Sequence, residues 1–376
     1  MPDIDPTTNN PNGASRVWIT GASVLAGGSS EIGRVWEALA NDEVLALAPP
    51  SLADLAAEAG LDSGDARIVS RTQLLALSVV ERSWKAARLP SQRNKLRGEG
   101  EKNRHPRIGV VAGSSLGGLC AMDFDLASGG EPSPYALSRW RGNSPAASVA
   151  LRFGCGGADF STNAASATGA QTLYLAALLV RSGVLDAVVA VAADQAPTDG
   201  ILAAMQANRS VTHSPEARPL GSLRKGMKPC EGAACLILES ESHARARGAE
   251  PLGEWLNPGD DAGRNEPPWT LLHATGTPRF DGIEIACLRR FFGGSLPWIT
   301  AVKRTTGHAL GASGLIEAVM AVEGFRRGEV PCWPSKTDPA LALDSARPSN
   351  PPRPETALLI GQGMGGAVVV NLLAGR

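Results

Sequence analysis

Short apolar runs alternate with longer amphipathic stretches along the chain. Continuous apolar runs rich in β-branched residues are typical of strands buried on both faces. They predict strands at 17–20, 108–112, 188–192, 234–238, 298–302, 357–360 and 368–372. Apolar positions at helical spacing predict helices at 71–87, 169–182, 281–292 and 311–326. Strands that alternate with helices indicate an α/β protein built in layers.

Segments rich in Gly, Pro and charge separate these elements. They predict loops at 95–107, 129–134, 257–268 and 333–355. Residues 1–15 are polar and lack the apolar stretch of a signal peptide, so we expect a disordered tail. A small-residue turn leads into a long helical pattern once in each half of the chain, which is a weak two-fold echo.

Composition excludes several classes of protein. The 376 residues include 36 basic and 37 acidic ones, and basic side chains gather locally, for example in the segment 93–104. Nucleic acid is therefore not an expected partner. No apolar run reaches the length of about 18 residues that a membrane span needs. The six scattered cysteines form no C-x-x-C pair, which favours reduced thiols in a cytoplasmic protein.

The first candidate for chemistry is the small-residue turn 161–169, which reads Ser-Thr-Asn-Ala-Ala-Ser-Ala-Thr-Gly before a predicted helix. A side chain held on such a turn lies at a helix N-terminus, where free N–H groups favour an anion. The turn therefore has the form of a nucleophile elbow. A serine in an Ala-rich turn is also a common helix cap.

Two histidine segments follow. His273 opens the sequence His-Ala-Thr-Gly-Thr-Pro, which cannot be helical and places hydroxyl groups beside the imidazole. Lys303 ends a predicted strand, and His308 follows five residues later in a Gly-containing turn. A lysine close to a histidine can hold the imidazole neutral. The alternatives are a structural His273, a solvated Lys303 and a capping His308.

The segment 361–366, Gly-Gln-Gly-Met-Gly-Gly, precedes the last apolar run. Four glycines in six positions permit positive φ angles and close backbone approach. The segment is either a plain hairpin turn or a flexible gate whose N–H groups help to form an oxyanion hole.

Taken together, the order and spacing of these segments resemble the elongating β-ketoacyl synthases of fatty-acid and polyketide assembly. His273 matches the family's H-G-T-G-T-P motif, and Lys303 with His308 matches K-x-x-x-G-H. Further matches are the opening strand at 17–21, the dimer-face segment around Asn143, the acidic residue Glu231 and the gate residue Met364. The resemblance runs from about residue 16 to the C-terminus.

The resemblance implies a thiolase-like α/β fold of two pseudo-symmetric halves, 16–245 and 246–376. Each half would hold a five-stranded sheet, and the whole would form five layers, α/β/α/β/α. It also implies an acyl-carrier-protein partner that delivers acyl groups on phosphopantetheine, with no other cofactor and no metal. The chain would form a homodimer, or a heterodimer with another ketosynthase, across the sheet on the nucleophile side.

The chain departs from the family at several positions. Ser166 stands where the family has its nucleophilic cysteine, Met364 replaces the gating phenylalanine, and Arg-Lys-Gly at 224–226 replaces Arg-Asp-Gly. The interval between Asn257 and Trp269 is shorter than in the family by about 30–40 residues, enough to remove a helix. A hydroxyl ionises far less readily than a thiol, so Ser166 would need a base.

The sequence therefore predicts an acyltransferase of the β-ketoacyl-ACP synthase type in fatty-acid or polyketide synthesis, polyene-type chains included. Ser166 would carry the acyl group, His273 and His308 would act on the malonyl partner or as bases, and Lys303 would tune His308. The backbone N–H groups of Ser166 and Met364 would form the oxyanion hole. The supporting residues would be Gly363, Gly365, Gly366, Glu231, Thr275, Thr277 and Asp281.

Three other interpretations remain at this point. The chain could be a non-catalytic, chain-length-factor-like subunit that pairs with a cysteine-bearing ketosynthase. It could be a scaffold that binds carrier protein and retains a vestigial site. Ser166 could also be an introduced replacement for a natural cysteine.

Overall fold

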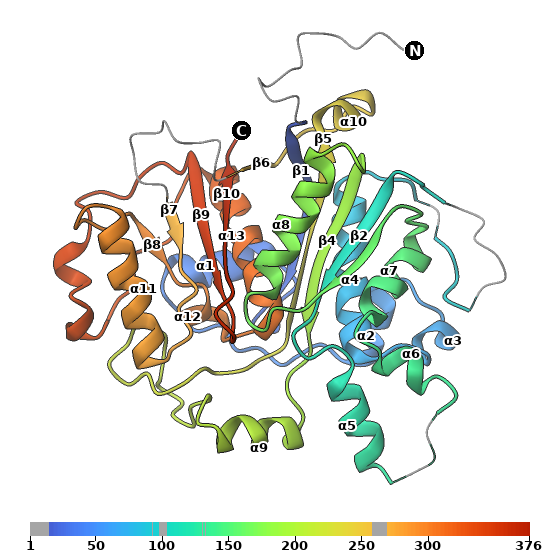
Figure 1. Cartoon of the computed structure of the whole chain (residues 1–376), viewed down its shortest axis with the longest axis horizontal. Helices are drawn as coiled ribbons and strands as arrows, with labels where there is room; N and C mark the ends of the chain where they lie inside the picture. The colour runs from blue at the N-terminus through green and yellow to red at the C-terminus, as the bar shows by residue number, and fades with distance from the viewer. Residues whose placement is uncertain (1–14, 92, 98–103, 130, 132, 258–268) are drawn as a thin grey trace.

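One mixed sheet of ten strands organises the molecule, which is a computed structural model that describes residues 15–376 except 92, 98–103, 130, 132 and 258–268 (Figure 1). The strands are Val17–Leu25 (β1), Ile108–Gly113 (β2), Asp159–Thr162 (β3), Ala187–Asp194 (β4), Gly232–Ser240 (β5), Gly253–Leu256 (β6), Trp269–Leu271 (β7), Ile299–Thr300 (β8), Thr356–Gln362 (β9) and Val368–Ala374 (β10). Their order across the sheet is β3-β2-β4-β5-β1-β6-β10-β9-β7-β8.

The second five strands repeat the first five. From its outer edge inward, the first half reads β3-β2-β4-β5-β1 and the second reads β8-β7-β9-β10-β6. The directions also repeat, because β2 is parallel to β3 and β4 just as β7 is parallel to β8 and β9. The two halves join where β1 pairs antiparallel with β6. This pairing gives hydrogen-bond partners to an edge strand of each half. The two five-stranded sheets that we expect from the sequence are therefore one continuous sheet of ten strands.

Two helices lie between the two halves of the sheet. The helices of the chain are Ile32–Ala40 (α1), Leu52–Glu58 (α2), Ser63–Ala66 (α3), Arg71–Ala86 (α4), Leu119–Ala127 (α5), Ala136–Trp140 (α6), Ser144–Phe153 (α7), Thr168–Arg181 (α8), Asp199–Ala207 (α9), Glu241–Ala246 (α10), Pro278–Phe291 (α11), Lys303–Thr306 (α12) and Ser313–Arg327 (α13). α8 and α13 each contact β5 and β1 of the first half and β9 and β10 of the second (Figure 1). α4 and α7 cover the outside of the first half, and α11 lies outside β7, so the fold has the five predicted layers.

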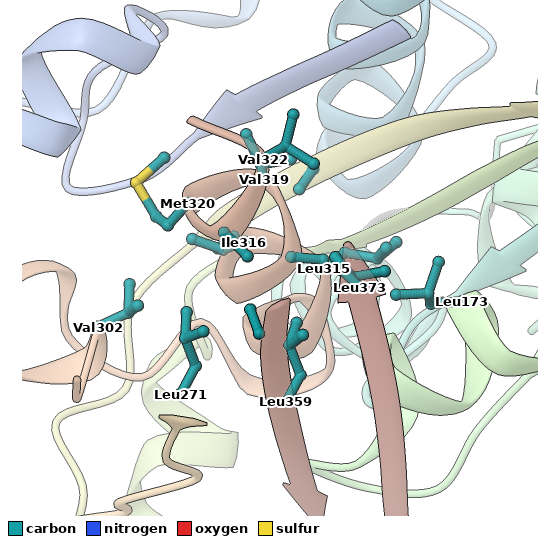
Figure 2. Packing of buried hydrophobic residues seen from close by; sticks show 14 of the residues in the cluster. Leu173, Leu271, Val302, Leu315, Ile316, Val319, Met320, Val322, Leu359 and Leu373 are labelled. Carbon is teal, nitrogen blue, oxygen red and sulfur yellow. The ribbon is translucent and has the colours of Figure 1, made fainter. Parts of the chain in front are cut away.

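Side chains of β4 alternate between two hydrophobic clusters, as a strand buried on both faces requires. Val188 and Ala190 join the cluster that contains α8 and α13, whereas Val189 and Val191 join the cluster of α4 and α7. In the second half, Leu315 and Ile316 of α13 lie in the same cluster as Leu271 of β7, Leu359 of β9 and Leu373 of β10 (Figure 2).

The N-terminal ends of α8 and α13 touch backbone to backbone. A Cβ atom on Gly314 would lie 2.5 Å from the amide nitrogen of Ala170, and one on Gly169 would lie 2.8 Å from the carbonyl oxygen of Gly311. Only glycine permits this approach. The two central helices are therefore fixed to each other at the ends from which the predicted functional loops depart.

All the predicted strands and helices are present, with shifted ends. The run at 298–302 forms only the short β8, because the chain turns into α12 at Lys303. The chain also contains β3, β6 and β7, which are too short for their periodicity to show in the sequence. The predicted tail lies outside the described residues apart from Ser15, as do parts of three predicted loops. Among the described helices, none combines the length and apolarity needed to cross a membrane.

Alanine substitutions at two helical glycines test the close contact of the central helices. Gly314→Ala should destabilise the fold by about 1–3 kcal/mol, because its methyl group meets the backbone of α8. The matched control is Gly282→Ala on α11, whose added methyl meets nothing within 4 Å. That change should stabilise the fold by about 0.5–1 kcal/mol through helix propensity. Free energies of unfolding from guanidinium titrations measure both. Equal values for the two variants would contradict the contact.

Candidate functional site

Ser166 lies on a tight turn between β3 and α8, as the sequence predicts. The preceding residue, Ala165, has a φ of 51°, an uncommon conformation for a residue with a Cβ. Ala167 is the cap position of α8 and has no side-chain capping bond, while Thr168 accepts from the N–H of Ala164 across the turn. Ser166 is partly exposed and caps nothing, so the structure agrees with the elbow and not with the helix-cap alternative.

The Gly-rich segment 361–366 packs directly on this elbow. A Cβ on Gly363 would lie 2.2 Å from the carbonyl oxygen of Ala164, and one on Gly361 would lie 2.5 Å from the Ala170 methyl. Gly365 and Gly366 have φ angles of 94° and 88° and carry the chain through the turn that follows. The Met364 side chain between them is 79% exposed. The hairpin therefore supplies backbone, and not a bulky side chain, to the neighbourhood of Ser166.

The side chains of His273 and His308 are both buried and lie next to each other. Their ring centroids are 5.9 Å apart and the rings are nearly perpendicular. Nδ1 of His308 accepts the backbone N–H of Leu310 at 3.0 Å, so in the neutral ring the proton sits on Nε2. Nε2 is buried and has no hydrogen-bond partner among the described residues. His308 is thus a free donor, held in one tautomer by its own turn.

Burial and a nearby cation keep both imidazoles uncharged. Desolvation holds the pKa of His273 and of His308 well below the usual value, and the charge of Lys303 lowers both further. Lys303 opens α12 instead of ending a strand, and its Nζ donates to the His273 carbonyl oxygen at 2.6 Å. The same Nζ pairs with buried Glu317 of α13 at 2.5 Å. Burial raises the pKa of Glu317 to about 7.

Two carboxylates hold the loop that begins at His273. Glu284 accepts the N–H groups of His273 and Ala274 at 2.7 and 2.8 Å, and burial raises its pKa to about 7. Asp281 accepts the N–H of Gly276 at 3.0 Å and that of Leu220 at 2.9 Å. Both side chains come from α11, one turn apart, so this helix sets the loop conformation.

The threonines of the same loop face each other. The hydroxyls of Thr275 and Thr277 lie 2.9 Å apart. Thr275 also lines a cavity of about 210 Å³ that reaches His308 and Lys303. The other charged or thiol groups on its wall are Arg218, Lys228, Cys230 and Arg304.

This cavity carries an excess of positive charge. Arg218 and Arg304 share one carboxylate, that of Asp42, and Lys228 donates to a backbone carbonyl. Cys230 is no substitute nucleophile, because burial raises its pKa to about 12 and its thiol donates to the Thr306 carbonyl. The cavity therefore favours an anion beside His308.

Glu231 follows Cys230, whose backbone N–H donates to the His308 carbonyl oxygen at 3.0 Å. It forms a two-pronged ion pair with Arg71 at the start of α4, with bonds of 2.6 and 2.7 Å. Sequence reasoning also missed Asp194, at the end of β4. That carboxylate is fully buried and accepts the N–H of Gly311 at 2.7 Å and that of Ser115 at 2.9 Å. An acidic residue at the end of an all-apolar strand was the available signal.

The sequence of the chain matches a known protein family. Residues 53–244 match the β-ketoacyl synthase N-terminal domain, and residues 271–335 match the β-ketoacyl synthase C-terminal domain. 3-Oxoacyl-[acyl-carrier-protein] synthase 2 of Coxiella burnetii is 28% identical over 60% of this chain, and this chain spans 64% of that protein's length. A chain named polyketide beta-ketoacyl synthase 1 of Streptomyces cyaneus is 29% identical over 72% of this chain and 75% of its own length.

Two solved structures share the fold. The ishigamide ketosynthase/chain length factor superposes with a TM-score of 0.79 at 20% identity, over 96% of this chain and 100% of that one. A type II PKS acyl-carrier protein in complex with its ketosynthase gives a TM-score of 0.76 at 20% identity, with the same coverage. The fold is thiolase-like, with an elbow and a histidine pair. The chain belongs to the β-ketoacyl synthase family.

Proton NMR tests the charge state of the site. The imidazole signal of His308 should not move between about pH 8 and about pH 5, a range that spans the ordinary histidine pKa of about 6.5. The spectrum of His308→Asn identifies that signal, and the denatured chain supplies a titrating reference. The unfolded chain binds this proton near pH 6.5 and the folded chain does not, so this group lowers stability as pH falls below that value. A native midpoint near 6.5 would contradict the assignment.

Proposed function

We propose that the chain is an acyl-carrier-protein-dependent acyltransferase of the ketosynthase type. The observation that carries the proposal is the neutral His308 beside His273, because its buried Nε2–H has no hydrogen-bond partner in the described part of the chain. Such a donor stabilises negative charge that develops on a thioester oxygen. The retained Lys303–Glu317 pair, which keeps the cation next to both histidines, supports an active site over a vestigial one.

In the first step, Ser166 Oγ attacks the carbonyl carbon of a carrier-bound acyl thioester. A C–O bond forms, the C–S bond breaks, and the serine proton passes through a base to the departing thiolate. His308 holds its own proton on Nε2, so the base is His273, which is neutral at pH 7. The N–H groups of Ser166 and Met364 make no hydrogen bond in the described part of the chain and form the oxyanion hole.

In the second step, a malonyl-class thioester loses carbon dioxide, and the resulting enolate attacks the acyl ester on Ser166. His308 Nε2–H stabilises the enolate oxygen. A C–C bond forms and the ester C–O bond breaks. The Ser166 oxygen then takes a proton from solvent water through His273, because its original proton left with the carrier thiol in the first step. The positive cavity beside His308 draws the negatively charged extender toward this position.

The second candidate function is a chain-length-factor-like partner subunit. The edge strand β3 supports assembly, because it is exposed at the end of the sheet and carries the exposed Phe160 beside the exposed Leu151 of α7. An unpaired edge of this kind pairs readily with another chain. Either a second copy or a cysteine-bearing ketosynthase would complete it, and the match to a ketosynthase/chain length factor is compatible with the second arrangement.

Intact-mass spectrometry separates the two functions. After incubation with acyl-carrier-protein thioesters of several acyl lengths, the chain should gain the mass of one acyl group, and Ser166→Ala should gain none. Ser166→Cys should acylate faster, because a thiol ionises more readily. Ser161→Ala, on the exposed end of β3, is the control that should keep the adduct. If no acyl length gives an adduct and the chain pairs tightly with a cysteine-bearing ketosynthase, the partner-subunit function replaces the first.

A further inference from the structure

The outer face of α11 is an apolar stripe in contact with solvent. Phe280 is 51% exposed, Ile283 45% and Phe291 78%, and Cys287 between them is also exposed. Their spacing of three or four residues places them on one side of the helix. We call Phe280, Ile283, Cys287 and Phe291 the α11 stripe. Contiguous apolar patches of this kind mark interaction sites.

The internal repeat of the fold shows why this stripe is bare. α11 precedes β8 in the second half as α7 precedes β3 in the first. α7 packs on α4: Gln73 donates to Ser148 at 2.6 Å, and the rings of Trp84 and Phe153 are 5.0 Å apart. As a result, seven of the 10 residues of α7 are buried, whereas only four of the 14 residues of α11 are buried.

Among the described residues, the second half has no counterpart of α4. In the first half, residues 26–107 connect β1 to β2 and contain α1, α2, α3 and α4. In the second half, residues 257–268 connect β6 to β7. A helix as long as α4 spans about 24 Å and needs 16 residues before any turn is added, so this connection is too short to supply one.

The charge around the stripe is positive. Arg279 and Arg290 lie on the exposed side of α11, and Arg279 lies over the ring of Phe280. The acidic residues of the helix, Asp281 and Glu284, are buried and bind backbone N–H groups of the His273 loop. The exposed side is therefore apolar with cationic flanks, and no carboxylate of α11 offsets them.

We propose that the α11 stripe binds an amphipathic helix of a partner protein, with an apolar face and acidic flanks. The helix would pack on α11 as α4 packs on α7, its carboxylates opposite Arg279 and Arg290. This surface is separate from the β3 edge, and the proposal does not depend on acyl transfer by Ser166.

Cys287 reports directly on occupancy of the stripe. The probe is a synthetic helix of about 18 residues with leucines on one face and glutamates on its flanks; its twin carries lysines in place of the glutamates. With the full chain, the acidic probe should bind by fluorescence anisotropy and slow alkylation of Cys287 about tenfold or more. Alkylation of Cys332, which is also exposed but lies after α13, should not change.

Variants locate the binding. Ile283→Glu and Phe291→Glu should abolish probe binding, and Phe160→Glu, on the β3 edge, should leave it intact. These are surface positions, and thermal melts confirm that each variant is folded. Equal binding of the two probes, or unchanged alkylation of Cys287, would overturn the proposal. It would also be overturned if Ile283→Glu dissociates a self-associated chain in sedimentation, because the occupant would then be a second copy.

Discussion

The close contact between the N-terminal ends of α8 and α13 is the constraint on which the rest of the structure depends. Gly169 and Gly314 let the two helices meet backbone to backbone at the centre of the molecule. The elbow with Ser166 leads into α8, and the turn with His308 leads into α13. A Cβ atom at either glycine would meet backbone atoms of the other helix at less than 3 Å, so the two helices would have to move apart. The position of Ser166 relative to the histidines is therefore set by helix packing and not by the loops themselves.

Around that contact, buried charge is arranged so that the histidines remain neutral. Lys303 is buried against Glu317 and the His273 carbonyl, and its charge opposes protonation of both rings. Removing one member of a buried ion pair leaves an uncompensated charge, which costs several kcal/mol. Glu317 belongs to α13, so the helix that fixes the geometry of the site also supplies the counter-charge for its lysine. The helix α13 therefore determines both where His308 lies and how the charge of Lys303 is balanced.

Much of this could be predicted from the sequence. Long apolar runs such as β4 and long helices such as α8 are visible because their periodicity extends over many residues. Ser166, His273 and His308 could be proposed as site residues because each lies in a segment of small or polar residues that the buried core does not require, and this role stays a prediction.

Other features could not be predicted, for physical reasons. β6 and β7 are too short to show a period, and they depend on pairing with distant strands. Glu284 and Glu317 lie within helical patterns and read as surface carboxylates, yet tertiary packing buries both. The partner of Glu231 could not be predicted either: it is Arg71 at the start of α4, 160 residues earlier in the chain. Burial and long-range partners decide such roles, and a single sequence contains neither.

The two halves also differ in a way that bears on assembly. They share strand order and direction, and each places one helix between the sheet halves, so the site-forming core is symmetric. Their outer layers are not symmetric, because α7 has α4 beside it and α11 has solvent. The helix that orders the His273 loop through Glu284 and Asp281 is thus the one whose outer face is uncovered. A partner on that face would contact the element that holds the loop, which couples assembly at the surface to the geometry of the site.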